Sequence, residues 1–122
     1  MIKGIGCDIV EHERINLTIA KKVLFETEVE QFNASNNQIE FLASRFAIKE
    51  AIIKATNKQF LMKDIIITNG HNGEPLCNIQ DVLITVSHEK KYSMAIAIWE
   101  KNDWYSANYW YKKSNSQYKH PK

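Results

Sequence analysis

The chain has 122 residues, which fits one compact domain, and its 44% hydrophobic and 25% charged residues are the balance of a soluble globular protein. A formal net charge of +2 is too small to indicate a nucleic-acid partner by itself. No apolar run approaches the roughly 18 residues of a transmembrane helix, so we expect no membrane association. Cys7 and Cys77 lack metal-type spacing, and as free thiols they fit a cytoplasmic protein.

The first half of the chain predicts one strand followed by two helices. Residues 2–10 are rich in β-branched side chains, which favours a strand. Helical spacing predicts a helix over 14–33, and residues 35–37 (Ser-Asn-Asn) then mark a break that offers N-cap side chains. The strongest helix signal covers 38–57, where apolar residues recur at steps of three and four.

The second half predicts strands and turns. Residues 64–68 are apolar and β-branched, and two Asn-Gly turn signals follow within 69–73. Residues 81–87 and 92–100 predict a hairpin. Residues 102–122 are rich in aromatic and basic side chains and show no period. We therefore expect an α+β fold in which a small antiparallel sheet packs against a long central helix.

Asp8 interrupts the first apolar strand. By strand alternation it shares a face with Gly4 and Gly6, and glycines on that face let another group approach the backbone. A carboxylate buried there without a partner would cost several kcal/mol. Asp8 is therefore a candidate ligand-binding residue. The alternative is an aspartate at a strand end that reaches water or caps the next helix.

Glu50 falls on the stripe of the long helix that also carries Phe46 and Ile53, so the sequence points a carboxylate at the core. The alternative is a surface ion pair with Lys54, four residues later. Two inward carboxylates make sense if Asp8 and Glu50 share a cation. Magnesium suits this arrangement, because it takes one or two carboxylates and fills its other positions with water and phosphate oxygens.

Three basic residues border the same helical stripe and are placed to hold a polyphosphate beside such a metal; they are Arg45, Lys49 and Lys54. A solvated helix rim is the alternative for each of them. Ser87 and His88 stand where a strand becomes a turn. They are candidate hydrogen-bond donors to a ligand, although a structural role is equally open and the dipeptide does not indicate a hydrolase triad.

Four sequence blocks resemble the holo-acyl-carrier-protein synthases, a family of short phosphopantetheinyl transferases. The blocks are GIGCDIVE at 4–11 with Arg14-Ile15, FLASRFAIKEA at 41–51 with Lys54-Ala55, NGEP at 72–75, and TVSH at 85–88 with YSMA at 92–95. Each block alone is weak, but their order and spacing over roughly residues 2–100 are specific.

The resemblance implies a 4'-phosphopantetheinyl transferase fold over residues 1–101, with 102–122 as an extension. It implies that Asp8 and Glu50 bind Mg²⁺ together with the pyrophosphate of coenzyme A, and that Lys54 joins them in catalysis. With the basic residues above, it assigns the following residues to the coenzyme: Arg45, Lys49, Lys54, Pro75, Ser87 and His88.

The implied reaction moves the phosphopantetheine arm of coenzyme A to a serine of an apo acyl carrier protein and releases adenosine 3',5'-bisphosphate. Glu50 and a metal-bound water both stay open as the group that takes the serine proton. Arg14, Lys21 and Lys22 resemble the basic surface that docks the acidic carrier. The resemblance also implies a homotrimer with active sites between subunits.

Two departures and two rival functions stand beside this prediction. Residues 56–60 (TNKQF) replace a glycine-rich loop, and Glu89 replaces a small hydroxyl residue, so the chain is alternatively a catalytically weakened homologue that binds coenzyme A. A small nucleic-acid-binding module using the aromatic and basic tail is the second rival. The second rival leaves the inward carboxylates Asp8 and Glu50 unexplained.

Overall fold

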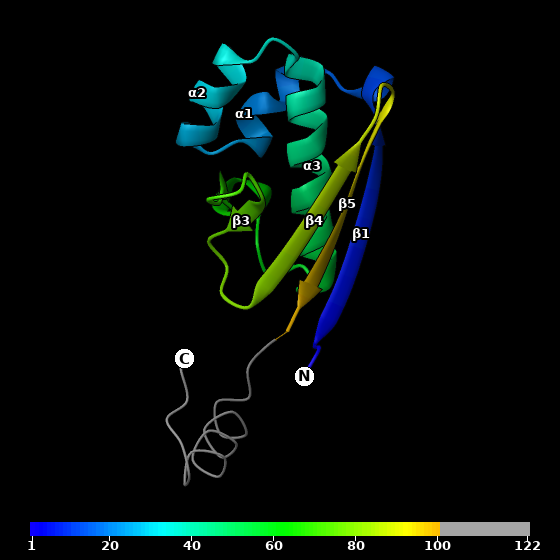
Figure 1. Ribbon diagram of the computed structural model, residues 1–122, viewed down its shortest axis with the longest axis vertical. Coiled ribbons are helices and arrows are strands. Elements are labelled where there is room, and N and C mark those ends of the chain that lie inside the picture. Colours follow the sequence, from blue (N-terminus) through cyan, green and yellow to red (C-terminus); the bar gives the residue numbers. More distant parts are fainter. Residues whose placement is uncertain (101–122) are drawn as a thin grey trace, which may run out of the picture.

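The computed structural model describes residues 1–100, and the expected extension at 102–122 lies outside them (Figure 1). The helices are η1 (His12–Arg14), η2 (Leu17–Ile19), α1 (Ala20–Val23), α2 (Glu26–Ala34), α3 (Gln38–Ala55) and η3 (Met62–Asp64). The strands are β1 (Gly4–Glu11), β2 (Ile67–Asn69), β3 (Pro75–Cys77), β4 (Val82–His88) and β5 (Tyr92–Trp99). The expected α+β class is confirmed. None of the described helices is long and apolar enough to cross a membrane.

The main sheet has three antiparallel strands in the order β1-β5-β4, so β1 and β4 are its edges. One face of this sheet packs against α3, the long central helix (Figure 1). β2 and β3 form a separate two-stranded hairpin. The register places Asp8 of β1 and Val86 of β4 on either side of Ala95.

β1 lies unusually close to α3. Gly4 and Gly6 face the helix, and a Cβ atom on either glycine would collide with the carbonyl oxygen of Ala55 or Ala51. The two alanines are fully buried in the main core. The strand face shared by Gly4, Gly6 and Asp8 is therefore a contact face with α3, as strand alternation predicted.

The buried face of α3 differs from the predicted stripe. Phe46, Glu50 and Ile53 are only partly buried, and a ridge of fully buried alanines spaced four residues apart faces the sheet instead: Ala43, Ala47, Ala51 and Ala55. Small side chains allow the helix to approach the sheet closely. A helical-wheel analysis instead gives the most weight to large apolar residues, so it predicted the wrong face. The prediction that Glu50 points straight at the core is thus wrong, because its side chain lies at the flank of α3.

The helix predicted over 14–33 is broken into short pieces. Leu24 and Phe25 are extended, and the carboxylate of Glu28 accepts the Phe25 backbone N–H at 2.8 Å, which starts α2. The apolar residues of this segment still pack together in a second core cluster beneath α1 and α2.

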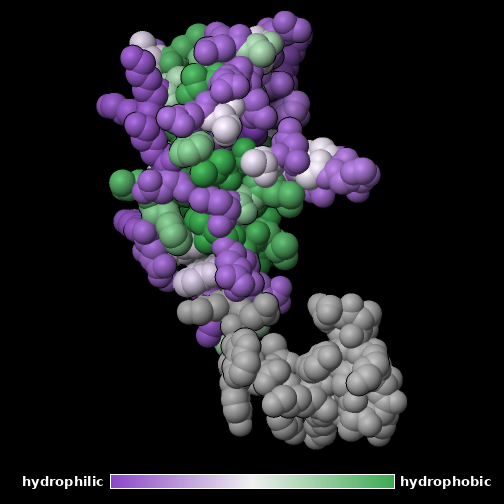
Figure 2. Space-filling view, turned by 90° about the vertical axis from the view of Figure 1, so that its left-hand side faces the viewer, coloured by the Kyte–Doolittle hydropathy of each residue, from purple (hydrophilic) through white to green (hydrophobic). Residues whose placement is uncertain are grey.

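On the side of the molecule that Figure 2 turns to the reader, apolar surface lies in the middle and polar side chains border it.

Both ends of α3 are closed by specific hydrogen bonds. Asn37 accepts the Glu40 N–H at 3.1 Å, which confirms the predicted N-cap. At the other end Lys58 N–H bonds the Ile53 carbonyl at 2.8 Å, with Asn57 and Lys58 at φ values of 58° and 62°. This is a Schellman-type end whose left-handed positions favour glycine. The chain therefore keeps a glycine-like backbone where the expected glycine-rich loop is absent.

Candidate functional site

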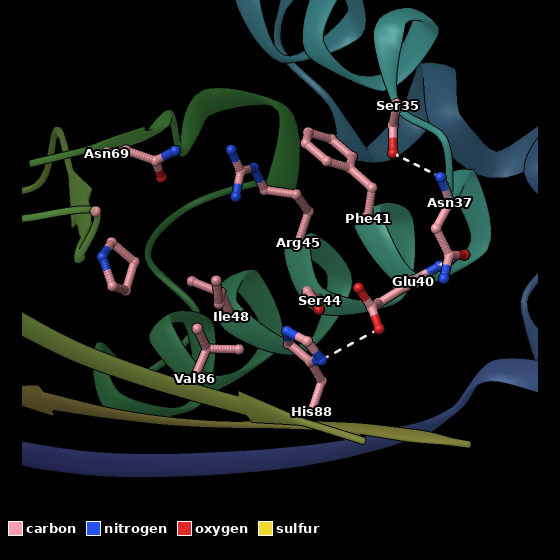
Figure 3. A pocket seen from close by; sticks show the side chains of 12 residues that line it. Ser35, Asn37, Glu40, Phe41, Ser44, Arg45, Ile48, Asn69, Val86 and His88 are labelled. Carbon is pink, nitrogen blue, oxygen red and sulfur yellow. Dashed lines mark hydrogen bonds and ion pairs between the residues drawn. The ribbon is translucent and has the colours of Figure 1, made fainter. Parts of the chain in front are cut away.

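A cavity of about 240 Å³ opens between α3, the β2–β3 hairpin and the end of β4 (Figure 3). Three of the residues predicted to contact the coenzyme line it: Arg45, Pro75 and His88. At the mouth, His88 Nδ1 lies 3.1 Å from Glu40 Oε2. Both side chains are partly exposed, so this contact is accessible to a ligand.

Ser87 does not join this cavity. It lies on the face of β4 that points away from α3, in register with Met94 of β5 and, one strand further, Ile9 of β1. The alternation of β4 thus sends Ser87 and His88 to opposite faces of the sheet, as expected for adjacent strand residues. Within one chain, only His88 of the pair reaches the cavity.

Arg45 forms one wall of the cavity and is almost buried. Its guanidinium lies 4.6 Å from the centre of the Phe41 ring, and Nη2 donates to Gln31 Oε1 at 3.0 Å. Nε lies 3.3 Å from Glu28 Oε2 without a hydrogen bond. Burial lowers the pKa of Arg45, and the Glu28 carboxylate counteracts this. An arginine in this setting remains charged.

Lys49 is fully buried, which corrects its assignment to the coenzyme. Its ammonium donates to the Val23 carbonyl at 2.6 Å and to Glu28 Oε1 at 2.5 Å. Burial lowers the pKa of Lys49, and the bond to Glu28 opposes that effect. With no exposed surface, Lys49 holds the α1–α2 segment onto α3 rather than contacting a ligand.

Glu28 is the residue that sequence reasoning missed. Its fully buried carboxylate meets Lys49 and Arg45 and also accepts the backbone N–H groups of Phe25 at 2.8 Å and Ile67 at 3.0 Å. The spacing from Phe25 to Glu28 is that of a local cap, but the partners from α3 and β2 are distant in sequence. One carboxylate against two cations leaves a net positive charge in this cluster, and because Arg45 lines the cavity, the charge favours an anionic ligand there.

The second group of predicted residues lies at the seam between β1 and α3. Lys54 Nζ contacts Asp8 Oδ1 at 3.2 Å and donates to the Cys7 carbonyl at 2.9 Å. Glu50 precedes Lys54 by one turn of α3, and within residues 1–100 it forms no ion pair with Lys54. The surface-pair alternative for Glu50 is therefore not what the structure shows, because Lys54 turns to Asp8.

The donor set at this seam fits Mg²⁺. The Asp8 side chain retains 18% exposure and Glu50 is partly exposed, so both carboxylates are reachable from water. No group of three or more His, Cys, Asp or Glu side chains gathers as a metal cage within residues 1–100. Two carboxylates suffice for magnesium when water and phosphate oxygens supply its other ligands.

The cavity and the β1–α3 seam lie on opposite flanks of α3. The cavity borders β4 and the seam borders β1, and these two edge strands are about 10 Å apart at the usual strand spacing. Around the helix, Arg45 and Glu50 point about 140° apart at 100° per residue. A single chain therefore holds two half-sites: Asp8, Glu50 and Lys54 in one, Arg45, Pro75 and His88 in the other.

The remaining predicted residues are on the surface. Arg14 in η1 and Lys21 and Lys22 in α1 are all exposed. Glu89 is exposed in the β4–β5 turn, where its N–H bonds the Tyr92 carbonyl at 2.9 Å, and it does not line the cavity. Its carboxylate is thus no obstacle to a phosphate in that cavity.

Comparison with known proteins gives consistent matches. Residues 4–107 match the model of the 4'-phosphopantetheinyl transferase superfamily. The chain is 43% identical to the holo-[acyl-carrier-protein] synthase of Mycoplasma capricolum subsp. capricolum, over 80% of this chain and 94% of the relative. Identity to that of Thermodesulfovibrio yellowstonii is 38%, over 80% and 98%.

A solved structure is similar over nearly its whole length. It is the crystal structure of a holo-(acyl-carrier-protein) synthase from Bacillus anthracis in complex with CoA (3',5'-ADP), with a TM-score of 0.76 and 32% identity. The match covers 84% of this chain and 99% of that one.

Proposed function

The chain belongs to the 4'-phosphopantetheinyl transferase superfamily, and from this premise we propose that it is a holo-[acyl-carrier-protein] synthase. It transfers the phosphopantetheine arm of coenzyme A to a serine of an apo acyl carrier protein. The observation that carries the proposal is the β1–α3 seam, where Asp8 and Lys54 meet one helical turn from Glu50. Three partly exposed or exposed acidic and basic groups from β1 and α3, the carboxylates of Asp8 and Glu50 and the ammonium of Lys54, suit a pyrophosphate with its metal.

In this reaction the serine oxygen attacks the β-phosphorus of the coenzyme. The bond from that phosphorus to the bridging oxygen breaks, adenosine 3',5'-bisphosphate leaves with the oxygen, and the serine proton passes to Glu50 or to water. Asp8 and Glu50 would hold Mg²⁺, which supplies neutralisation of the pyrophosphate charge when bound. Lys54 binds phosphate oxygens, and its exposed ammonium is free to turn from Asp8 toward them.

The cavity takes another anionic part of the coenzyme. The cluster of Arg45, Lys49 and Glu28 carries an excess positive charge, its Arg45 lines the cavity, and His88 stands at the mouth. His88 contacts the Glu40 carboxylate in the free chain. A phosphate bound in the cavity takes the place of that carboxylate as the partner of His88.

A neighbouring copy completes the site. Because the two half-sites lie on opposite flanks of α3, the seam of one chain needs the cavity of another. The sheet face away from α3 offers the contact surface, since several apolar side chains on it are exposed: Ile5, Ile9, Leu83 and Met94. An uncovered apolar sheet face of this kind marks an interface. We propose a cyclic homotrimer with three shared sites, working in the cytoplasm, where its free thiols stay reduced.

Arg14, Lys21 and Lys22 form the proposed docking surface for the acidic carrier. Reversing these three charges raises the KM for the carrier several-fold at low salt and leaves the KM for coenzyme A unchanged, because exposed complementary charge governs encounter. The effect shrinks as salt rises. The matched control exchanges the same residues while keeping their charge: Arg14→Lys, Lys21→Arg and Lys22→Arg. An unchanged carrier KM at low salt places docking elsewhere.

The direct test incubates the full chain with apo carrier protein, coenzyme A and Mg²⁺ and weighs the carrier by mass spectrometry. The expected result is a mass gain of one phosphopantetheine that disappears with a chelator. Coenzyme binding without any gain supports the weakened homologue instead. Absence of both contradicts the proposed function.

A further inference from the structure

A chain of three hydrogen-bonded polar side chains, two of them buried, links the end of β1, β5 and α3. His12, just after β1, is 8% exposed, and its Nε2 lies 2.8 Å from the hydroxyl oxygen of Ser93. Ser93 is fully buried on β5, and its hydroxyl lies 2.9 Å from that of Ser44 on α3. The other ring nitrogen of His12, Nδ1, lies 3.1 Å from the Lys90 carbonyl.

The direction of these hydrogen bonds follows from their first member. A carbonyl oxygen only accepts, so Nδ1 of His12 carries the proton and donates to Lys90. When the imidazole carries this proton alone, Nε2 accepts and Ser93 donates to it. Ser93 has no second proton, so Ser44 must donate to Ser93. The Ser44 oxygen is left with its lone pairs as an acceptor.

Ser44 is the member of the chain that lines the cavity (Figure 3). It is partly exposed, whereas His12 and Ser93 are buried behind it. Its neighbours in the wall, Arg45 and His88, present hydrogen-bond donors suited to an anion. Ser44 adds an acceptor of fixed direction, which suits a neutral donor group.

Fold stability alone does not require polar side chains at His12 and Ser93. Apolar groups of the same shape are often as stable as a satisfied buried hydrogen bond. This series of hydrogen bonds ends at a cavity that can hold a ligand. That position distinguishes the cluster from hydrogen bonds that serve only the stability of the fold. The same residues do not belong to the set that the sequence assigned to the coenzyme.

We propose that Ser44 is a binding residue for coenzyme A and accepts a hydrogen bond from one of its amine, amide or hydroxyl groups, with Ser93 and His12 as positioning residues. This inference rests on the proposed function, which places the coenzyme in the cavity. The contact is made equally in the ground state and in the transition state. It therefore sets the affinity for coenzyme A rather than the rate of the chemical step.

The first test compares Ser44→Ala and Ser44→Cys with the unchanged chain in the transfer assay. Loss of one hydrogen bond raises the KM for coenzyme A about three- to tenfold, with kcat within about twofold. Ser44→Thr, which keeps a hydroxyl, restores most of the affinity. Thr27→Ala removes an exposed hydroxyl on α2 and is the matched control.

The second test asks whether His12 and Ser93 act through Ser44. His12→Leu and Ser93→Ala each raise the KM for coenzyme A by a smaller factor, because the Ser44 hydroxyl is then free to rotate. A double variant that adds Ser44→Ala to either substitution has the same KM for coenzyme A as Ser44→Ala alone. Fully multiplicative effects would contradict the positioning role.

Calorimetry measures the affinities for coenzyme A and for adenosine 3',5'-bisphosphate in the absence of the transfer reaction. Comparing the two affinities locates the donor group on the coenzyme. An equal loss for both ligands in Ser44→Ala places the donor on the nucleotide half, and a loss for coenzyme A alone places it on the pantetheine half. Unchanged affinity for coenzyme A in a folded Ser44→Ala or Ser44→Cys protein overturns the inference, even if the unfolding midpoint falls. Failure of the proposed function is separate, since it appears as no mass gain with the unchanged chain.

Discussion

Asp8 and Glu50 are the two carboxylates from which the metal proposal is built. Asp8→Asn and Glu50→Gln keep their shapes but remove the charges proposed to hold Mg²⁺, so transfer should fall at least about 100-fold while folding persists. The carrier mass assay measures the rate, and a thermal unfolding curve checks the fold. Glu30→Gln, an exposed glutamate on α2, is the control. A wild-type rate at ordinary Mg²⁺ concentration in either variant would remove the residue from the metal site.

Glu28 stabilises the fold through its buried ion pairs and is not proposed to contact a ligand. Glu28→Gln leaves the buried charges of Lys49 and Arg45 without their carboxylate, and breaking a buried ion pair from one side costs about 3–5 kcal/mol. Denaturant unfolding measures this cost. The control is Glu26→Gln, which changes an exposed glutamate in the first turn of the same helix.

The same substitution has a pH signature. The pKa of Lys49 already lies below its ordinary 10.5 because of burial, and losing Glu28 lowers it further. In the Glu28→Gln variant the folded chain then binds fewer protons than the unfolded chain in the alkaline range below 10.5. Its free energy of unfolding therefore rises with pH relative to the unchanged chain, so the cost of the substitution shrinks. A cost that is constant up to pH 10.5 would contradict this account of Lys49.

At the scale of elements, the packing of β1 on α3 places Asp8. Gly6→Ala drives a methyl group into the Ala51 carbonyl, so β1 must shift, at a cost of about 1–3 kcal/mol. Because Asp8 is two residues further along the strand, transfer should fall as well. Denaturant unfolding and the carrier mass assay measure the two effects.

Gly73→Ala provides the contrast. Gly73 has a φ of +83° but open space around it, so its substitution lowers stability only through backbone strain, by about 1 kcal/mol. A Gly6→Ala protein as stable and active as the unchanged chain would show that the β1–α3 contact is not required.

At the scale of the whole molecule, the two half-sites predict complementation between inactive variants. Asp8→Asn inactivates the seam and Arg45→Ala weakens the cavity, so each pure assembly has little activity. Random mixing by unfolding and refolding pairs an intact seam with an intact cavity at about one interface in four, which restores about a quarter of the activity. Mixing the assembled proteins without exchange is the control. No recovery in verified mixed assemblies would mean that both half-sites act within one chain.

The class of fold, the long helix with its Asn37 cap and the hairpin of β4 and β5 could all be predicted from the sequence, because they depend on local periodicity and capping. The sequence also identified the glycine face of β1, since alternation along one strand needs no knowledge of its partner. The four motif blocks were enough to indicate the family, which the comparisons confirm.

The distribution of the site residues could not be predicted in this way, because it depends on tertiary packing. Lys49 is buried because Glu28, twenty-one residues earlier, is carried beneath it by α2. Ser44 lines a cavity and contacts Ser93, which in turn contacts His12, because β1 and β5 pair in one register. Asp8 and His88 lie on the same face of one sheet but at opposite edges, with α3 between them. Each of these outcomes depends on which distant segments meet, and local patterns in a sequence do not specify that.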